Sequence, residues 1–464
     1  MTYQGWILDL YPKPGQMIIW LKQSDGSCVR LADAWKPRIH VGGTFDNLLT
    51  LQSFLPTSQF VEKFERAGDK DRSQVLEVEV ESELDAQALA RKIFRRGGYG
   101  KYCLYDVDIP SIQMYLYHKD LFPLAFVEAN PVHGHVDWVV KDSREQTKYT
   151  LPTLRTLRLE LSTKKAKKIP TFEDELDKII LHEGNDVTVL DSGSESDRIM
   201  QLVGVFRDKD PDVILTEGGD SFLFPYLARR AQRRGILNQM ILGREEAPLR
   251  VYEVQGHSYF SYGKILFKQT AARLLGRLHV DEANGFISSD CGLEGLFEVA
   301  RTCIIPLQRA SRTTIGTSMT SLQCYTAIKA GVLIPWNKNE PEEWKNGNEL
   351  IVADRGGLIY EPEWGLHESV GELDFTSLYP TIMRDRNLSG ETVRCKCCPN
   401  STIRVPKLGW NVCERWDGIA ARALDILLTK RLLYKKYKKE ASDPLLRDQY
   451  DRRQAALKWI LVCS

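Results

Sequence analysis

The stretch from Glu372 to Met383 places one carboxylate, Asp374, among apolar and aromatic side chains. This pattern is typical of a buried strand that runs into a turn or helix start at Pro380. Because an ionised carboxylate is costly to bury alone, we expect Asp374 to meet a cation or a strong hydrogen-bond donor. A divalent metal ion is the natural candidate, since it prefers carboxylate oxygens. The alternative is that Asp374 caps a helix or forms a salt bridge at a strand end. Judged without its neighbours, Asp374 would favour this alternative.

The string DFTSLYP at residues 374–380 resembles motif A of the family B DNA polymerases, which reads D-x-x-S-L-Y-P. This resemblance implies transfer of deoxynucleotides to a primer 3′-OH by Mg²⁺-assisted in-line attack. It assigns catalysis and metal binding to Asp374, with the backbone carbonyl of Phe375 as a further metal ligand. It also places the incoming nucleotide against Leu378 and Tyr379, and gives Tyr379 the task of excluding ribonucleotides.

Residues 131–345 alternate strand-like and helical runs, a pattern that fits a ribonuclease H-like sheet. In the family this position holds a proofreading 3′–5′ exonuclease, whose metal ions need four carboxylates. The four positions that match those ligands are Glu160, Ser162, Leu223 and Asp290. Since two of them carry no carboxylate, we expect a domain that keeps its fold and has lost its chemistry. A shifted alignment that uses Asp220 is the alternative.

An eroded exonuclease before an intact motif A resembles the second archaeal group of the family, which has some bacterial relatives. The segment Arg355, Gly356 and Gly357 takes the place of the family's Y-x-G-G segment, and the resemblance implies that it binds template DNA. Glycines let the backbone approach phosphates closely. A plain glycine turn between two strands is the alternative, because Asp354 stands where the family has Tyr.

Four cysteines follow motif A within a short stretch: Cys395, Cys397, Cys398 and Cys413. Zn²⁺ takes four thiolates in tetrahedral geometry and would pin a loop that is too small for its own core. However, adjacent cysteines such as Cys397 and Cys398 do not easily bind the same ion. Free thiols in a hairpin are therefore the alternative to a zinc site. The other cysteines are scattered and are expected to be reduced.

Two helices are expected next, over residues 418–440 and after the turn at Ser442. In the family, an antiparallel helix pair called the fingers grips the triphosphate, and the resemblance assigns this role to Arg431 and Lys458. Arg431 could donate two hydrogen bonds at once. Lys458 begins a stretch that resembles motif B, K-x3-N-S-x-Y-G, and would neutralise charge on the triphosphate. A solvated charged helix face is the alternative.

These features predict an α/β and α+β multidomain chain. Its expected parts are an α/β N-terminal domain over 1–130, the ribonuclease H-like domain over 131–345, the first part of the palm over 346–415, and the helical fingers over 416–464, cut within motif B. The thumb and motif C, which carries the second metal-binding Asp, are not found. We therefore expect a second chain to supply both; a split gene, an intein or a truncation would each explain this.

Composition adds little about function. Lys and Arg together number 63 and Asp and Glu 62, so any DNA-binding surface must come from local clustering of charge. With no apolar run long enough to span a membrane and no signal peptide, we expect a cytoplasmic, nucleoid-associated protein. The expected partners are primer–template DNA, deoxynucleoside triphosphates and a sliding clamp. A non-catalytic DNA-binding or scaffold protein is the alternative function, and a working exonuclease is a third.

Overall fold

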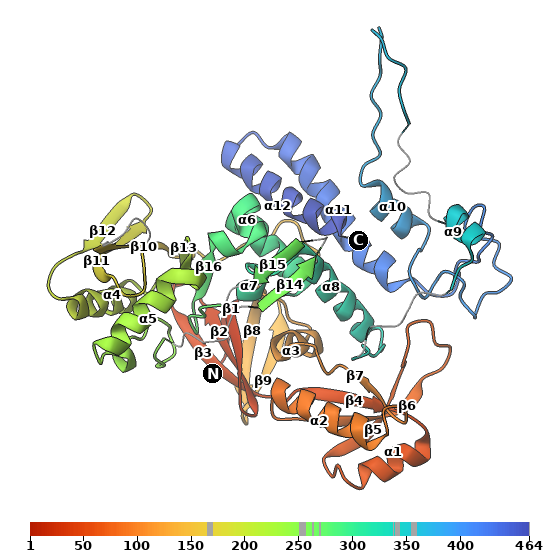
Figure 1. Cartoon of the computed structure of the whole chain (residues 1–464), viewed down its shortest axis with the longest axis horizontal. Coiled ribbons are helices and arrows are strands. Elements are labelled where there is room, and N and C mark those ends of the chain that lie inside the picture. The colour runs from red at the N-terminus through yellow and green to blue at the C-terminus, as the bar shows by residue number, and fades with distance from the viewer. Residues whose placement is uncertain are drawn as a thin grey trace. The chain divides into compact units, whose positions relative to one another are not determined.

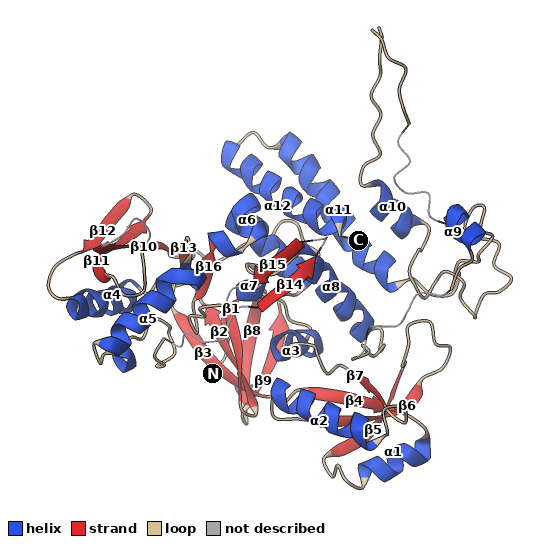
Figure 2. Ribbon diagram, in the orientation of Figure 1, coloured by secondary structure: helices blue, strands red, loops and turns tan. Residues whose placement is uncertain are grey.

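The structure is a computed structural model. It describes residues 1–164, 170–249, 257–261, 264–268, 271–336, 338, 344–353 and 360–463, with the backbone alone for 257–261 and 264–268. The chain forms two compact units, whose elements are drawn in Figure 1 and Figure 2. The first unit comprises Met1–Lys36, Pro110–Ser321 and Lys430–Ile460, and the second comprises Pro37–Ile109, Leu322–Thr429 and Leu461–Ser464. No described helix is both long and apolar enough to cross a membrane.

The first unit contains an antiparallel sheet in the order β3-β2-β1-β8-β9. Its strands are β1 (Tyr3–Lys13), β2 (Gln16–Lys22), β3 (Cys28–Ala34), β8 (Phe126–Val132) and β9 (His135–Val140). Apolar and β-branched residues such as Ile7, Ile18 and Ile19 are fully buried, as expected for side chains that suit a pleated surface. Helix α3 (Ser111–Lys119) is tied to this sheet by the Tyr115 hydroxyl, which donates to Oδ2 of Asp33 at 2.7 Å.

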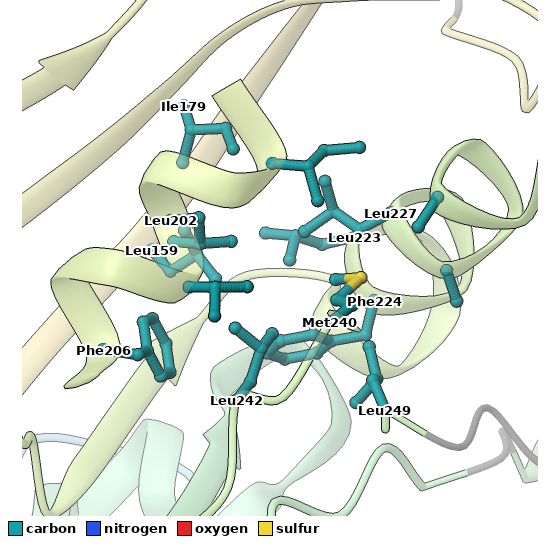
Figure 3. Packing of buried hydrophobic residues seen from close by; sticks show 14 of the residues in the cluster. Leu159, Ile179, Leu202, Phe206, Leu223, Phe224, Leu227, Met240, Leu242 and Leu249 are labelled. Carbon is teal, nitrogen blue, oxygen red and sulfur yellow. The ribbon is translucent and has the colours of Figure 1, made fainter. Parts of the chain in front are cut away.

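A second, mixed sheet in the first unit has the order β12-β11-β10-β13-β16. Its strands are β10 (Thr156–Lys164), β11 (Glu175–Glu183), β12 (Asp186–Leu190), β13 (Val213–Thr216) and β16 (Leu278–Asp281). β10, β13 and β16 are parallel, so their connections must cross over the sheet. Helices α4 (Glu195–Lys209) and α5 (Phe224–Arg233) lie in these connections. Their apolar faces and the sheet enclose the core shown in Figure 3, where Leu159, Leu202 and Phe224 meet.

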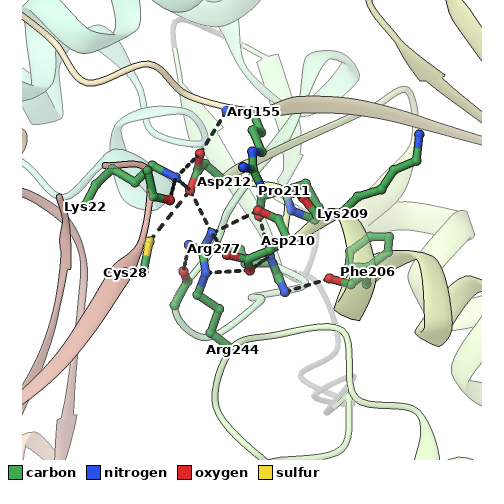
Figure 4. A network of polar contacts seen from close by, with 12 residues as sticks. Lys22, Cys28, Arg155, Phe206, Lys209, Asp210, Pro211, Asp212, Arg244 and Arg277 are labelled. Atoms are coloured by element: carbon green, nitrogen blue, oxygen red, sulfur yellow. Dashed lines mark hydrogen bonds and ion pairs between the residues drawn. The ribbon is translucent and has the colours of Figure 1, made fainter. Parts of the chain in front are cut away.

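A buried polar network links β2 to the start of β13, as Figure 4 shows. Asp212 is fully buried and receives donors from three directions. Nζ of Lys22 lies 2.8 Å from its Oδ2, Nη2 of Arg244 lies 2.7 Å from its Oδ1, and the backbone N–H of Arg155 donates to Oδ2 at 2.8 Å. Arg277 and Arg244 also both bind Asp210. Each buried charge in this network therefore has an opposite partner.

The second unit contains an antiparallel sheet in the order β5-β6-β4-β7. Its strands are β4 (Arg38–Gly42), β5 (Ser58–Lys63), β6 (Ser73–Glu79) and β7 (Cys103–Tyr105). Helices α1 (Phe45–Gln52) and α2 (Glu83–Arg96) contribute Leu48, Ala90 and Ile93 to its core. The Ser82 side chain caps α2 by accepting a hydrogen bond from the backbone N–H of Asp85.

The remaining helices follow in chain order. They are α6 (Phe286–Cys303), α7 (Leu307–Ala310), α8 (Ile315–Lys329), α9 (Gly347–Ala353), α10 (Leu378–Asp385), α11 (Ile419–Glu440) and α12 (Pro444–Val462). The two helices expected after the cysteines are thus present as α11 and α12. In the first unit they run antiparallel, with Nζ of Lys438 2.8 Å from Oδ2 of Asp451 and the rings of Tyr434 and Tyr450 stacked at 6.0 Å.

His40, on β4, lies buried between two carboxylates. Its Nδ1 is 2.8 Å from Oδ2 of Asp106, and its Nε2 is 3.3 Å from Oε2 of Glu77. Burial alone would lower the pKa of His40, but the two carboxylates outweigh it and raise this pKa above 6.5. The hydrogen bond from His40 in turn lowers the pKa of Glu77 to about 2.

We expect the stability of the second unit to depend on pH through this cluster. Because the folded-state pKa of His40 is raised, its contribution is complete below pH 6.5 and is lost as the pH rises through that pKa. The contribution of Glu77 is complete above 4.5 and is lost as the pH falls towards 2. Thermal unfolding from about pH 5 to about pH 9 should therefore show stability declining on the alkaline side. His40→Gln should remove this decline and the exposed His133→Gln should keep it; identical profiles would contradict the prediction.

Candidate functional site

The segment around Asp374 does not form the strand that its sequence predicts, and the prediction of a buried strand there is wrong. Residues 371–375 have no regular secondary structure, and the side chains of Leu373 and Phe375 are 98% and 75% exposed. A strand needs a neighbour for its backbone N–H and C=O groups, and no described strand pairs with this segment. The expected helix start is correct: α10 begins at Leu378, with Pro380 in its first turn, where proline is tolerated.

Asp374 is exposed in this segment. Its carboxylate has no hydrogen-bond or ion-pair partner among the described residues, which corrects the expectation of a buried, paired side chain. Tyr379, in the first turn of α10, is also largely exposed. The expected metal ligand and the expected sugar gate therefore both lie open to solvent, one just before and one within the start of the same helix. Whether Phe375 offers its carbonyl to a metal ion stays a prediction.

Arg431 and Lys458, the expected triphosphate ligands, belong to the first unit, whereas Leu378 and Tyr379 belong to the second. Lys458 is exposed on α12. Arg431 is only 9% exposed on α11, and this burial lowers its pKa below the usual range. A common triphosphate site for the four residues stays a prediction. Arg355, Gly356 and Gly357, expected to bind DNA, lie outside the described residues.

Sequence reasoning missed the residue next to Arg431. Lys430 is buried, and its Nζ lies 2.7 Å from Oε1 of Glu298 on α6. The hydroxyls of Tyr149 and Tyr434 donate to Oε2 of Glu298 at 2.7 and 2.8 Å. Burial alone would raise the pKa of Glu298, but Lys430 and these donors hold it below the usual range. Because Lys430 lies in a basic stretch that looks solvated, its sequence gives no signal of this role.

Helix α12 is held to α6 by two further contacts. Nε and Nη2 of Arg453 donate to Oε2 of Glu294 at 3.0 and 2.8 Å. Nε1 of Trp459 donates to Oδ2 of Asp290 at 2.7 Å. Charged and aromatic side chains of α11 and α12 thus bind this helix pair to α6. Asp290, which was expected to be a remnant of the nuclease site, holds this helix pair.

The other three residues expected at the nuclease site also lie close to other parts of the fold. Glu160 is exposed and lies 3.7 Å from His182. The Ser162 hydroxyl donates to Oδ2 of Asp177 at 2.9 Å. Leu223 is 4% exposed and belongs to the core of Figure 3. Among the described residues, no set of three or more carboxylate or histidine side chains is arranged to hold a metal ion.

Two carboxylates near Leu223 are engaged elsewhere. Asp220 receives Nε of Arg312 at 2.6 Å and Nη2 of the same side chain at 3.2 Å. Asp281 accepts the backbone N–H groups of Gly218 and Asp220, each at 2.8 Å. Arg312 and the neighbouring donors keep the pKa of Asp220 low although its burial alone would raise it. Asp220 thus forms an ion pair with the side chain of Arg312, and the shifted alignment stays a prediction.

The four clustered cysteines come together in space. Their Sγ atoms all lie within 4.8 Å of one another, and they are the only group of three or more candidate ligands that the described residues place around one point. The Sγ of Cys397 lies 3.5 Å from that of Cys413 and 3.6 Å from that of Cys398. None of the chain's ten cysteines is in a disulfide.

Two family models match the chain. The model described as DNA polymerase family B matches residues 326–463, and the model described as DNA polymerase family B, exonuclease domain, matches residues 106–286. The first match contains the segment of Asp374, the cysteines and the α11–α12 pair. The second contains all five strands of the mixed sheet. The prediction of a mixed α/β multidomain chain with an exonuclease-type domain is confirmed.

Several curated relatives of the chain come from archaea. A DNA polymerase of Pyrococcus horikoshii is 28% identical over 309 residues, which cover 57% of this chain and 24% of that protein. DNA polymerase 1 of Pyrococcus abyssi is 26% identical over 403 residues, which cover 76% of this chain and 49% of that protein. The chain thus spans at most about half the length of these relatives. The structure of the family B DNA polymerase from Pyrobaculum calidifontis matches with a TM-score of 0.74 at 19% identity, over 99% of this chain and 67% of that one, which supports the fold.

Proposed function

This chain belongs to the family B DNA polymerases, and from that premise we propose that it takes part in template-directed DNA synthesis, the transfer of a deoxynucleotide to a primer 3′-OH. The observation that carries the proposal is the string of residues 374–380, which lies within the stretch matched by the polymerase model and presents Asp374 and Tyr379 to solvent beside the start of α10. The proposed substrates are primer–template DNA and deoxynucleoside triphosphates.

Asp374 suits a divalent metal ion because its carboxylate is accessible and has no partner among the described residues. Mg²⁺, when bound, would supply charge neutralisation for the attacking and leaving oxygens. Such a site needs more than one carboxylate, and no group of three or more candidate ligands among the described residues includes Asp374. We therefore propose that a segment carrying motif C and the thumb completes the site, either on a second chain or further along the same protein.

The exposed apolar residues around motif A support this proposal. Residues 360–375 include Tyr360, Trp364, Leu366 and Leu373, all largely exposed. Large apolar side chains that are exposed together in one short segment can mark a surface that another segment or chain covers. The backbone of residues 371–375, which pairs with no described strand, could take up a further strand by ordinary β-pairing. A motif C hairpin added there would cover Leu373 and place its own carboxylates close to Asp374.

For the triphosphate we assign Lys458 first, because its ammonium group is exposed. Arg431 could contribute its bidentate donors only after a local movement of α11 uncovers it, since it is largely buried. We further propose that the exonuclease-type domain has lost its nuclease activity. The surroundings of Ser162, Leu223 and Asp290 support this, because each of these side chains packs or binds elsewhere.

The test is single-nucleotide incorporation on a primer–template with Mg²⁺, using the chain alone and the chain mixed with a fragment that carries motif C and the thumb. We expect synthesis in the mixture, and Asp374→Ala should lower its rate by on the order of 10³-fold. Glu372→Ala, which removes another exposed carboxylate of the same segment, is the matched control and should keep the activity.

The alternative, a non-catalytic protein that binds DNA, has one observation in its favour: no group of three or more candidate metal ligands among the described residues includes Asp374. It predicts no synthesis in any mixture, together with salt-sensitive primer–template binding that is the same for the native chain and Asp374→Ala. That result would overturn the proposed function.

A further inference from the structure

We propose that Cys395, Cys397, Cys398 and Cys413 bind one structural Zn²⁺ ion, and that this ion fixes the junction between α10 and α11. The sequence leaves two alternatives open for these cysteines, a zinc site and free thiols, and the positions of the sulfur atoms favour the zinc site. The binding of the ion does not depend on the proposed polymerase function. Only its consequence for DNA synthesis does.

The sulfur positions suit a single tetrahedral ion. With Zn–S bonds of about 2.3 Å, thiolates at the corners of a tetrahedron lie about 3.8 Å apart. The Sγ of Cys413 lies 3.5 Å from that of Cys397 and 4.0 Å from that of Cys398, and all four sulfurs lie within 4.8 Å of one another. A disulfide would need two sulfurs at about 2.0 Å, and no pair is joined.

The objection that adjacent cysteines do not easily bind one ion is met by the local backbone. Cys397 and Cys398 both direct their sulfurs towards Cys413, with 3.6 Å between their own Sγ atoms. Cys395 and Cys413 are buried, whereas Cys397 and Cys398 are partly exposed. The site is therefore closed on one side and reachable by solvent on the other, which gives an ion a way in.

A polar side chain orients the loop that carries the ligands. Nδ2 of Asn411 donates to the carbonyl oxygens of Cys395 and Cys398, both at 2.9 Å, and lies 3.4 Å from the Sγ of Cys395. The backbone N–H of Cys413 donates to the carbonyl of Thr392 at 2.8 Å, which closes the hairpin. Such outer contacts hold metal ligands in place.

The hairpin has little else to stabilise it. Between residues 386 and 417, the buried apolar side chains are Val412 and the cysteines Cys395 and Cys413. A segment with so small a core commonly depends on a metal ion or a disulfide for its fold. Four thiols around one point, with no disulfide, indicate the metal ion.

The same segment caps α11. The side chain of Asn387, just after α10, accepts the backbone N–H of Gly418 at 2.7 Å and donates to the carbonyl of Cys413 at 3.1 Å. The next two N–H groups, of Ile419 and Ala420, donate to Glu391 and Ser389. Because the first turn of a helix has unpaired N–H groups, these contacts set where α11 begins. An ion in the hairpin would therefore fix the junction between the end of α10 and the start of α11.

The test is the metal content of the full chain, purified under reducing conditions without added metal. We expect one zinc per chain by elemental analysis, and release of that zinc when a mercurial reagent blocks the thiols. Cys413→Ser should reduce the bound zinc at least tenfold, whereas Cys103→Ser, at an exposed cysteine of the same unit, should leave it unchanged. Co²⁺ in place of zinc should give the visible absorption of a tetrahedral thiolate site.

If Cys413→Ser does not fold, the partly exposed Cys398 gives a second test, because Cys398→Ser changes no buried side chain. Asn411→Ala keeps all four thiols and should weaken zinc binding about 10- to 100-fold. A native chain without zinc, a disulfide between Cys413 and another cysteine, or full zinc in Cys398→Ser would overturn the proposal. Normal zinc in a chain that synthesises no DNA would leave the metal site standing and reject the polymerase function.

Discussion

Replacing Lys430 with Met should lower the free energy of unfolding of the first unit by about 3–5 kcal/mol, because it leaves Glu298 buried without its counter-charge. Glu298 has no exposed surface, and Nζ of Lys430 lies 2.7 Å from its Oε1. The hydroxyls of Tyr149 and Tyr434 would remain as donors, but they carry no charge. Urea unfolding monitored by the circular dichroism of the helices would give the change.

Two further variants of the chain make this measurement specific to the ion pair between Lys430 and Glu298. Lys439→Met removes an exposed ammonium group from the same helix, and should change the free energy of unfolding by less than about 0.5 kcal/mol. The double variant Lys430→Met with Glu298→Gln should recover much of the loss, because neither charge is then left unpaired. A single Lys430→Met variant as stable as Lys439→Met would show that the pair contributes nothing.

Asp212→Asn should have an effect of similar size, about 3–5 kcal/mol, because it leaves Lys22 and Arg244 with one buried carboxylate fewer. Asn keeps the shape of Asp but not its charge, and Asp212 is fully buried between the two cations (Figure 4). Calorimetric melting should show the transition of the first unit at a clearly lower temperature.

The matched control for this change is Asp208→Asn, which removes an exposed carboxylate near the end of α4. It should leave the melting temperature close to that of the native chain. If Asp212→Asn melts at the same temperature as this control, then Arg244 is neutralised sufficiently by Asp210 alone, and the network tolerates the loss of one charge.

Local signals in the sequence predicted several elements correctly. The apolar spacing and the Ser442 turn predicted α11 and α12, and Pro380 marked the start of α10. The same reasoning failed at residues 371–375, because an alternation of apolar residues describes a strand only if another strand is there to pair with it. Sequence reasoning missed the role of Lys430 for a related reason. A Lys in a basic stretch looks solvated until the partner helix, α6 with Glu298, is placed against it.

The compact units could not be read from the order of the chain. Residues 1–130 were expected as one domain, yet β1 to β3 belong to the first unit and β4 to β7 to the second. The reason is that β1 pairs with β8, which follows more than a hundred residues later. A pairing between strands this far apart in the chain produces no local pattern in the sequence. The expected domain bounds therefore stay predictions, while the cysteine cluster, whose spacing is short, could be singled out from the sequence.

The position of Leu223 bears on how such a protein could evolve. Its side chain is now part of the interior that supports β10, α4 and α5 (Figure 3). The mutation Leu223→Asp would place a carboxylate in that interior and destabilise the fold by several kcal/mol before any metal could bind. If a nuclease was lost here, its recovery would first require neighbouring side chains to be repacked. In that case, the loss of the activity and its recovery would not be steps of equal probability.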